Sequence, residues 1–150
     1  MKPGLAPILA CCVLGVVATA VTFVVRAATI LPDGPVDLVW DKTACAHCSM
    51  HVGEPEFAAQ LQTTDGRTLA FDDPGCLFEY LAGAHPEVHA IWFHHQKEDR
   101  WLPWTAVAFV AVQPTPMGYG LGAVDPADGT IDLATARERC RDHTIHGANR

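Results

Sequence analysis

The fold is decided by residues 57–76, which read FAAQLQTTDGRTLAFDDPGC. Two segments in this stretch, 57–63 and 67–71, alternate in polarity and flank the pair Asp65-Gly66. An Asp-Gly pair between alternating segments predicts a β-hairpin. We therefore expect two antiparallel strands.

A helix is expected directly after this hairpin. Asp73 supplies an N-cap side chain, and Pro74 suits the first helical turn. Apolar residues at helical spacing follow and stop at Gly83. Two strands followed by a helix indicate the α+β class, to which we assign the chain.

The rest of the chain continues this pattern. Short strands are predicted at 38–40 and 119–124, further strands at 88–94 and 105–112, and a second helix at 133–140. Asp125-Pro126 precedes the second helix as Asp73-Pro74 precedes the first. The order strand, turn, strand, Asp-Pro, helix thus occurs twice, which suggests an internal repeat.

The N-terminal segment differs in composition from the rest. No charged residue occurs from Pro3 to Val25, between Lys2 and Arg26. A bilayer span needs about 20 apolar residues, so this run is long enough. We favour an uncleaved transmembrane helix over a cleaved signal peptide or a lipoprotein signal ending before Cys11, and each alternative exports the remainder.

These observations divide the chain into three parts. Residues 1–26 are the membrane anchor or signal segment, 27–37 form a linker with two prolines and a glycine, and 38–150 form the metal-binding domain argued for below. The expected location is the cell membrane, with a single N-terminal span and the domain on the extracytoplasmic side.

The charge of the chain excludes nucleic acid as a partner. Ten Lys and Arg residues stand against 17 Asp and Glu residues, for a net charge of −7. No Lys/Arg cluster is present to neutralise phosphates.

Phosphate-binding loops, G-x-S-x-G elbows and H-E-x-x-H motifs are absent too, so we expect a protein that is not an enzyme.

Four cysteines follow the N-terminal segment: Cys45, Cys48, Cys76 and Cys140. In an oxidising compartment they could form two disulfides. Cys76 stands at the start of the first predicted helix, where it is either an activated thiol or a small buried residue. Cys140 lies on a helical segment with Arg137, Arg139 and Arg141, away from the other motifs, and is interpreted as free or structural.

The cluster Cys45-Ala-His-Cys48-Ser-Met50-His51 carries most of the chemistry. Met50 lies in a loop beside the two thiols, and Met117 lies in a second Gly/Pro-rich loop, so neither fits a core helix stripe. Thiolate and thioether ligands select monovalent copper, whereas zinc prefers Cys, His and carboxylate. The sulfur set therefore points to Cu(I).

The chain resembles the NosL family, the copper chaperones associated with nitrous-oxide reductase. Three blocks carry the resemblance: 45–52 (CAHCSMHV), 71–77 (FDDPGCL) and 116–121 (PMGYGL). The resemblance implies two similar β-β-α-β halves and a Cu(I) site that uses a cysteine of the first block and Met117. Ser49 departs from the family pattern, because it replaces a common glycine.

The expected function is therefore copper binding and delivery. Cys48 and Met117 hold Cu(I), with Cys45, Met50 and His51 in or beside the site and Cys76 as a further candidate. The recipient is a copper enzyme such as nitrous-oxide reductase, or a copper transport system.

Two alternatives stay open. A thiol-disulfide oxidoreductase would use Cys45 and Cys48, although Gly53 and Pro55 interrupt any helix after the motif. A structural zinc module would use Cys45, Cys48, Cys76 and a histidine.

Overall fold

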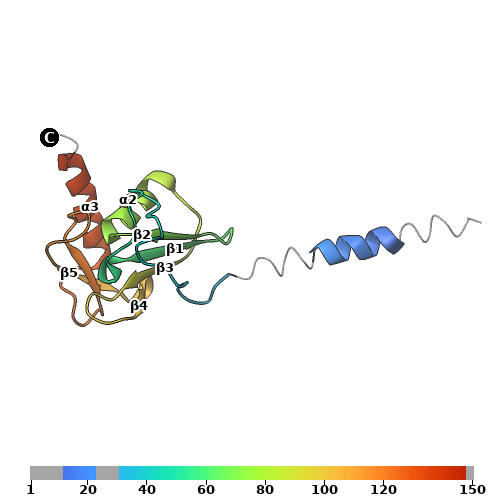
Figure 1. Cartoon of the computed structure of the whole chain (residues 1–150), viewed down its shortest axis with the longest axis horizontal. Coiled ribbons are helices and arrows are strands. Elements are labelled where there is room, and N and C mark those ends of the chain that lie inside the picture. Colours follow the sequence, from blue (N-terminus) through green and yellow to red (C-terminus); the bar gives the residue numbers. More distant parts are fainter. Residues whose placement is uncertain (1–11, 23–30, 148–150) are drawn as a thin grey trace, which may run out of the picture. The chain divides into compact units, whose positions relative to one another are not determined.

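The computed structural model describes residues 12–22 and 31–147. The chain divides into two compact units, Met1–Leu31 and Pro32–Arg150, and residues 12–22 of the first unit form a helix (Figure 1). In the part of the chain that is described, no helix is both long and apolar enough to span a bilayer. Residues 1–11 and 23–26 of the predicted anchor lie outside the described residues.

The predicted hairpin is present. Strands β1 (Ala59–Thr63) and β2 (Thr68–Phe71) pair antiparallel, with Leu61 opposite Leu69. Gly66 in the turn has φ +87°, a conformation that glycine adopts without steric cost. The Asp-Gly pair thus joins the strands as the sequence predicts.

The first helix is also confirmed. Helix α2 (Pro74–Ala84) begins after Asp73, whose Oδ1 accepts a hydrogen bond from the Gly75 backbone N–H at 2.8 Å. It ends at His85, which is in the left-handed region. Strands β3 (Val88–His94) and β4 (Trp101–Pro103) complete a four-stranded sheet of order β2-β1-β3-β4.

The second part of the domain is a smaller two-stranded sheet and a helix. This part consists of β5 (Ala108–Ala111), β6 (Leu121–Val124) and α3 (Leu133–Gly147). Two short 3-10 helices, Pro55–Phe57 before β1 and Trp104–Ala106 before β5, lie in the connecting segments. The α+β class is confirmed. Two similar β-β-α-β halves are not confirmed, since in the described residues β4 extends the first half and no strand follows α3.

Asp125-Pro126 does not repeat the capping role of Asp73-Pro74. The Asp125 carbonyl oxygen accepts hydrogen bonds from the backbone N–H groups of Asp128 and Gly129, which closes a turn. The cap of α3 is Asp132, whose carboxylate accepts from the Thr135 N–H at 2.7 Å. The prediction was wrong here because Asp-Pro also starts turns.

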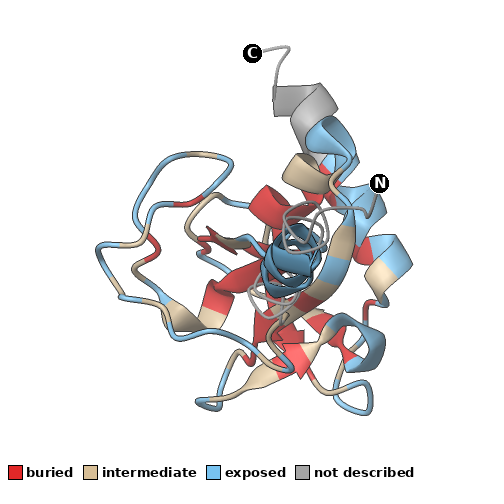
Figure 2. Ribbon diagram, turned by 90° about the vertical axis from the view of Figure 1, so that its right-hand side faces the viewer, coloured by how far each residue is buried: buried red, intermediate tan, exposed pale blue. Residues whose placement is uncertain are grey.

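One apolar core joins both sheets to α2. Phe78 of α2 packs against Phe93 of β3 and Phe109 of β5, with ring centroids 5.7 and 5.9 Å away, and Phe93 and Phe109 are 5.2 Å apart. Figure 2 shows the buried residues concentrated in the strands and in the helix segments that face them. The loops around this core are largely exposed.

Residues 34–36 cover the other face of the large sheet. Gln60 of β1 accepts from the Val36 N–H at 2.9 Å and donates to the Val36 carbonyl, while Gln62 donates to the Gly34 carbonyl at 2.6 Å. This cover buries Gln60 and Gln62, while Ala59 and Leu61 of the same strand belong to the apolar core. The compact unit therefore begins at Pro32, within the expected linker, and residues 38–40 form no strand.

Candidate metal centre

A tight loop presents the two thiols of the C-x-x-C motif. Ala44 and His51 form an isolated antiparallel bridge at its base. The Cys45 N–H donates to the Met50 carbonyl at 2.7 Å, and the Ser49 N–H donates to the Cys45 carbonyl at 3.0 Å. Ser49 has φ +65°, a left-handed conformation that glycine adopts without steric cost.

The loop is fixed to the large sheet and so to the helix behind it. The Ala46 N–H donates to the carbonyl of Ala70 in β2, at 2.8 Å. Three residues after β2, Pro74 starts α2, and Cys76 lies in the first turn of that helix. The hairpin thus places Cys76 against the loop.

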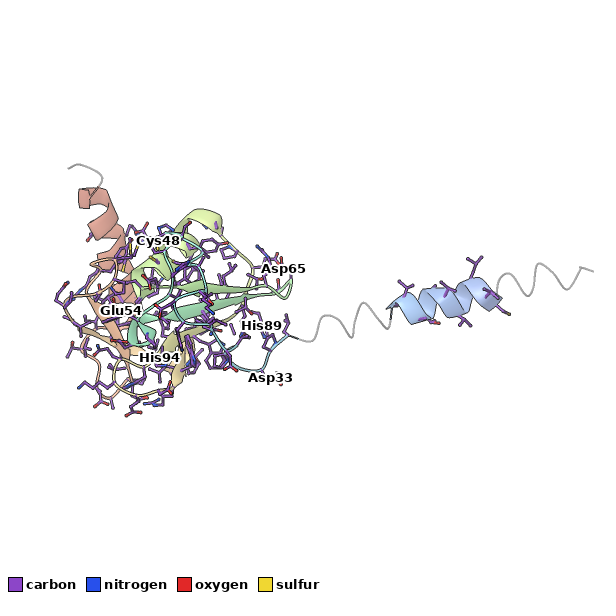
Figure 3. All side chains as sticks on the ribbon, viewed as in Figure 1. Asp33, Cys48, Glu54, Asp65, His89 and His94 are labelled. Atoms are coloured by element: carbon purple, nitrogen blue, oxygen red, sulfur yellow. The ribbon has the colours of Figure 1, made fainter. Side chains whose placement is uncertain are left out.

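Three thiols meet at this point. The Sγ atoms of Cys45, Cys48 and Cys76 all lie within 4.8 Å of one another. Cys45 is 2% exposed and Cys76 is fully buried, whereas Cys48 is half-buried. Figure 3 shows Cys48 beside α2. Such a cluster can hold one soft metal ion, with Cys48 as the side open to solvent.

The thiols differ in their affinity for protons. A hydrogen bond from the Cys76 thiol lowers the pKa of Cys45 to about 4, against the desolvation that opposes it. The same hydrogen bond, together with burial, raises the pKa of Cys76. Burial raises the pKa of Cys48. The metal-free cluster therefore carries one thiolate, on Cys45, and a bound cation would displace the remaining protons.

The loop that carries Met117 is attached to the N-terminus of the same helix. The Met117 N–H donates to Asp73 Oδ2 at 3.3 Å. Tyr119 lies over Gly75 so closely that a Cβ added there would be 2.0 Å from the tyrosine Cγ. Met117 itself is half-buried and packs against the core. The structure thus brings the methionine loop to the helical turn that carries Cys76.

Met50 and His51 lie at the end of the C-x-x-C loop, where the Met50 carbonyl accepts from the Cys45 N–H and His51 bridges to Ala44. Met50 is 48% exposed, and His51 is exposed as well. Among the residues that the structure describes, no histidine nitrogen or carboxylate oxygen joins the three sulfurs within 4.8 Å. The sequence placed Cys76 last among the candidates, yet its sulfur is one of the three.

Cys140 is not one of the three clustered thiols among the described residues. It is 2% exposed on α3, and burial raises its pKa to about 12. None of the described cysteines, Cys12, Cys45, Cys48, Cys76 and Cys140, forms a disulfide. The interpretation with two disulfides is therefore not found in this structure.

Sequence reasoning missed the second role of Asp73. One oxygen caps α2, and the other holds the methionine loop. The sequence signal for this role was the pair Asp72-Asp73, because one carboxylate is enough to cap a helix and the second needs another explanation. Asp72 uses its carboxylate differently, because it accepts from the Gly53 N–H at 3.4 Å.

Comparison with known proteins supports the resemblance at the level of fold. No protein-family model matches the sequence, and no curated protein matches it. The crystal structure of the copper chaperone NosL from Shewanella denitrificans is similar, with a TM-score of 0.53 and 17% sequence identity. The similarity covers 75% of this chain and 89% of that one.

The chain has a NosL-like fold. The suspected resemblance to NosL is thus confirmed in three dimensions, although the identity of 17% limits the conclusion to the fold. The evidence for a metal site in this NosL-like domain is therefore the geometry of its own three thiols.

Proposed function

We propose that the NosL-like domain binds Cu(I) through Cys45, Cys48, Cys76 and Met117 and delivers it to a copper enzyme. The observation that carries the proposal is the group of three thiol sulfurs within 4.8 Å of one another. A site of soft sulfur ligands favours monovalent copper over the hard cations that oxygen ligands bind.

Copper is favoured over structural zinc by what the cluster lacks. A structural zinc site needs a fourth ligand, commonly histidine or cysteine. In the described part of the chain, no histidine joins Cys45, Cys48 and Cys76. The Met117 loop is hydrogen-bonded to the start of α2, the helix that carries Cys76, so the Met117 thioether is the fourth ligand that we propose, and a thioether is a poor ligand for zinc.

Redox catalysis is disfavoured by the placement of the thiols. Thiol-disulfide exchange needs an exposed nucleophile with a lowered pKa. Here the thiol with the lowered pKa, Cys45, is 2% exposed, while burial raises the pKa of the more accessible Cys48. We accordingly propose a binding protein, not an enzyme.

The proposal also covers the delivery of copper to a recipient protein and the location of the domain in the cell. The similar structure is described as a copper chaperone, and a half-exposed Cys48 offers a route for ligand exchange with a recipient. We propose a recipient such as nitrous-oxide reductase, from the resemblance to the NosL family. We also propose extracytoplasmic location, from the uncharged run at 3–25.

The test is a competition titration against a Cu(I) chelator under anaerobic conditions. Cys45→Ser, Cys48→Ser and Cys76→Ser should each weaken Cu(I) binding, because a hydroxyl is a poor ligand for a soft ion. Cys140→Ser is the matched control and should bind as tightly as the wild type. Equal affinities for all four variants would rule the cluster out as the copper site.

A further inference from the structure

Both oxygens of the buried Asp73 carboxylate are used, and they serve two different segments. Oδ1 accepts from the Gly75 N–H at 2.8 Å, within α2, and Oδ2 accepts from the Met117 N–H at 3.3 Å. The Thr115 side chain also donates to this carboxylate. Asp73 is fully buried, so water does not compete for these bonds.

Thr115 extends this contact through the methionine loop. Its Oγ1 accepts from the Gly120 N–H at 3.1 Å while its hydroxyl donates to Asp73. The two ends of the loop, Thr115 and Gly120, are thus connected to one carboxylate. The position of Met117 between them is fixed relative to the first turn of α2.

Packing supports the same docking independently. Gly75 has no side chain where the Tyr119 ring lies, and a Cβ there would be 2.0 to 2.5 Å from ring carbons. Any larger residue at position 75 would push the loop away from the helix. One hydrogen-bonded contact and one close packing contact therefore hold the loop at the turn that carries Cys76.

We propose that Asp73 is the positioning residue that presents the Met117 thioether to the three thiols and thereby makes the site selective for Cu(I) over Zn(II), an inference that rests on the function proposed above. Without the thioether, three thiolates remain, and these bind zinc as well as copper. With it, copper gains a fourth soft ligand that offers little to zinc. Selectivity then depends on a carboxylate that does not touch the metal.

Asp73→Asn separates this role from helix capping. Asparagine caps helices about as well as aspartate, so its single oxygen can keep the Gly75 contact. Its NH₂ group then faces the Met117 N–H, and two donors cannot bond to each other. Thr115→Val is the second variant, because it removes the hydroxyl from the loop side and leaves the cap intact.

The experiment uses the full chain and two readouts. The first is the affinity for Cu(I) and for Zn(II) by competition titration, with Asp73→Asn, Thr115→Val, Met117→Ala and the double variant Asp73→Asn/Met117→Ala. Loss of a residue that orients a ligand typically lowers metal affinity by about 10- to 100-fold. We expect Cu(I) affinity to fall by about tenfold in each single variant and Zn(II) affinity to stay unchanged.

The double variant should bind Cu(I) as tightly as Met117→Ala alone, since Asp73 acts through Met117. The second readout is the NMR signal of the Met117 methyl group, which is easily assigned because the chain has three methionines. Cu(I) should shift this signal in the wild type and leave it unshifted in Asp73→Asn and Thr115→Val.

Failure of the inference differs from failure of the proposed function. A wild-type Met117 signal that Cu(I) does not shift would remove the thioether from the proposed site and the inference with it. A shifted wild-type signal that stays shifted in both loop variants would overturn the inference alone. Additive losses in the double variant would also overturn it, because Asp73 would then act elsewhere.

Discussion

The thiol of Cys76 donates a hydrogen bond to the sulfur of Cys45, and this bond links the first turn of α2 to the C-x-x-C loop. Both side chains are buried, at 0% and 2% exposure. Only Cys48 of the three clustered thiols is half-buried. A metal ion in this cluster would therefore have two shielded ligands and one that a recipient can reach.

Cys45 should be a thiolate in the metal-free, reduced protein at neutral pH. Its pKa is lowered to about 4, mainly by the hydrogen bond from Cys76. Thiolate absorbance near 240 nm should show this charge at pH 7 and its loss as the pH falls through about 4. Cys76→Ala removes the donor and should move this transition to higher pH.

The same shift predicts how the stability of the metal-free domain depends on pH. A cysteine in the unfolded chain has a pKa of about 8.5, so the folded state holds the thiolate more strongly. This contribution is fully present above the unfolded pKa and is lost as the pH falls through the folded value of about 4. A Cys45→Ser variant whose melting temperature falls just as steeply with acid would contradict this prediction.

Much of the first half of the domain follows from local sequence rules. The Asp-Gly turn, the cap at Asp73 and the apolar run at Val88–His94 each act over a few residues, and each element formed where expected. Strand β4 (Trp101–Pro103) was not predicted, because three residues carry no periodic pattern. Its place depends on pairing with β3.

The candidate site was only partly predictable, for a related reason. The motif itself marked Cys45 and Cys48, but Cys76 joins them through the way β2 leads into α2 behind the loop. The contact between Asp73 and Met117 spans 44 positions along the chain and leaves no local pattern. Tertiary contacts of this kind have to be seen in three dimensions.

Met117→Ala should lower Cu(I) affinity and leave Zn(II) affinity and folding nearly unchanged, because a neutral thioether helps a soft ion and offers little to zinc. Met50→Ala is the comparison variant, since it removes the other loop methionine, which is 48% exposed. If Met117 only fills space, its loss should instead reduce stability by about 2–5 kcal/mol. Thermal melting and Cu(I) titration of the same samples separate the two roles.

Ser49→Gly should stabilise the domain. Ser49 has φ +65°, and a residue with a Cβ pays about 1–2 kcal/mol for this conformation, which glycine does not. The melting temperature of the metal-free protein should rise by several degrees. Ser49→Ala is the control and should give no such rise, and a glycine variant that melts no higher than wild type would show that the serine is not strained.

The full chain should sediment with membranes and resist carbonate extraction. The reason is the uncharged run from Pro3 to Val25, which is long enough to cross a bilayer. A native protein that is fully soluble and begins at Val21 or Ala28 would show instead that the segment is a cleaved signal.

The most direct test of the central claim is X-ray absorption spectroscopy of the copper-loaded, reduced wild-type protein. We expect monovalent copper with only sulfur neighbours, from Cys45, Cys48, Cys76 and Met117. Cys76→Ser should show fewer sulfur neighbours, while Cys140→Ser should match the wild type. A first shell dominated by nitrogen or oxygen, or one that Cys76→Ser leaves unchanged, would contradict a copper site at this cluster.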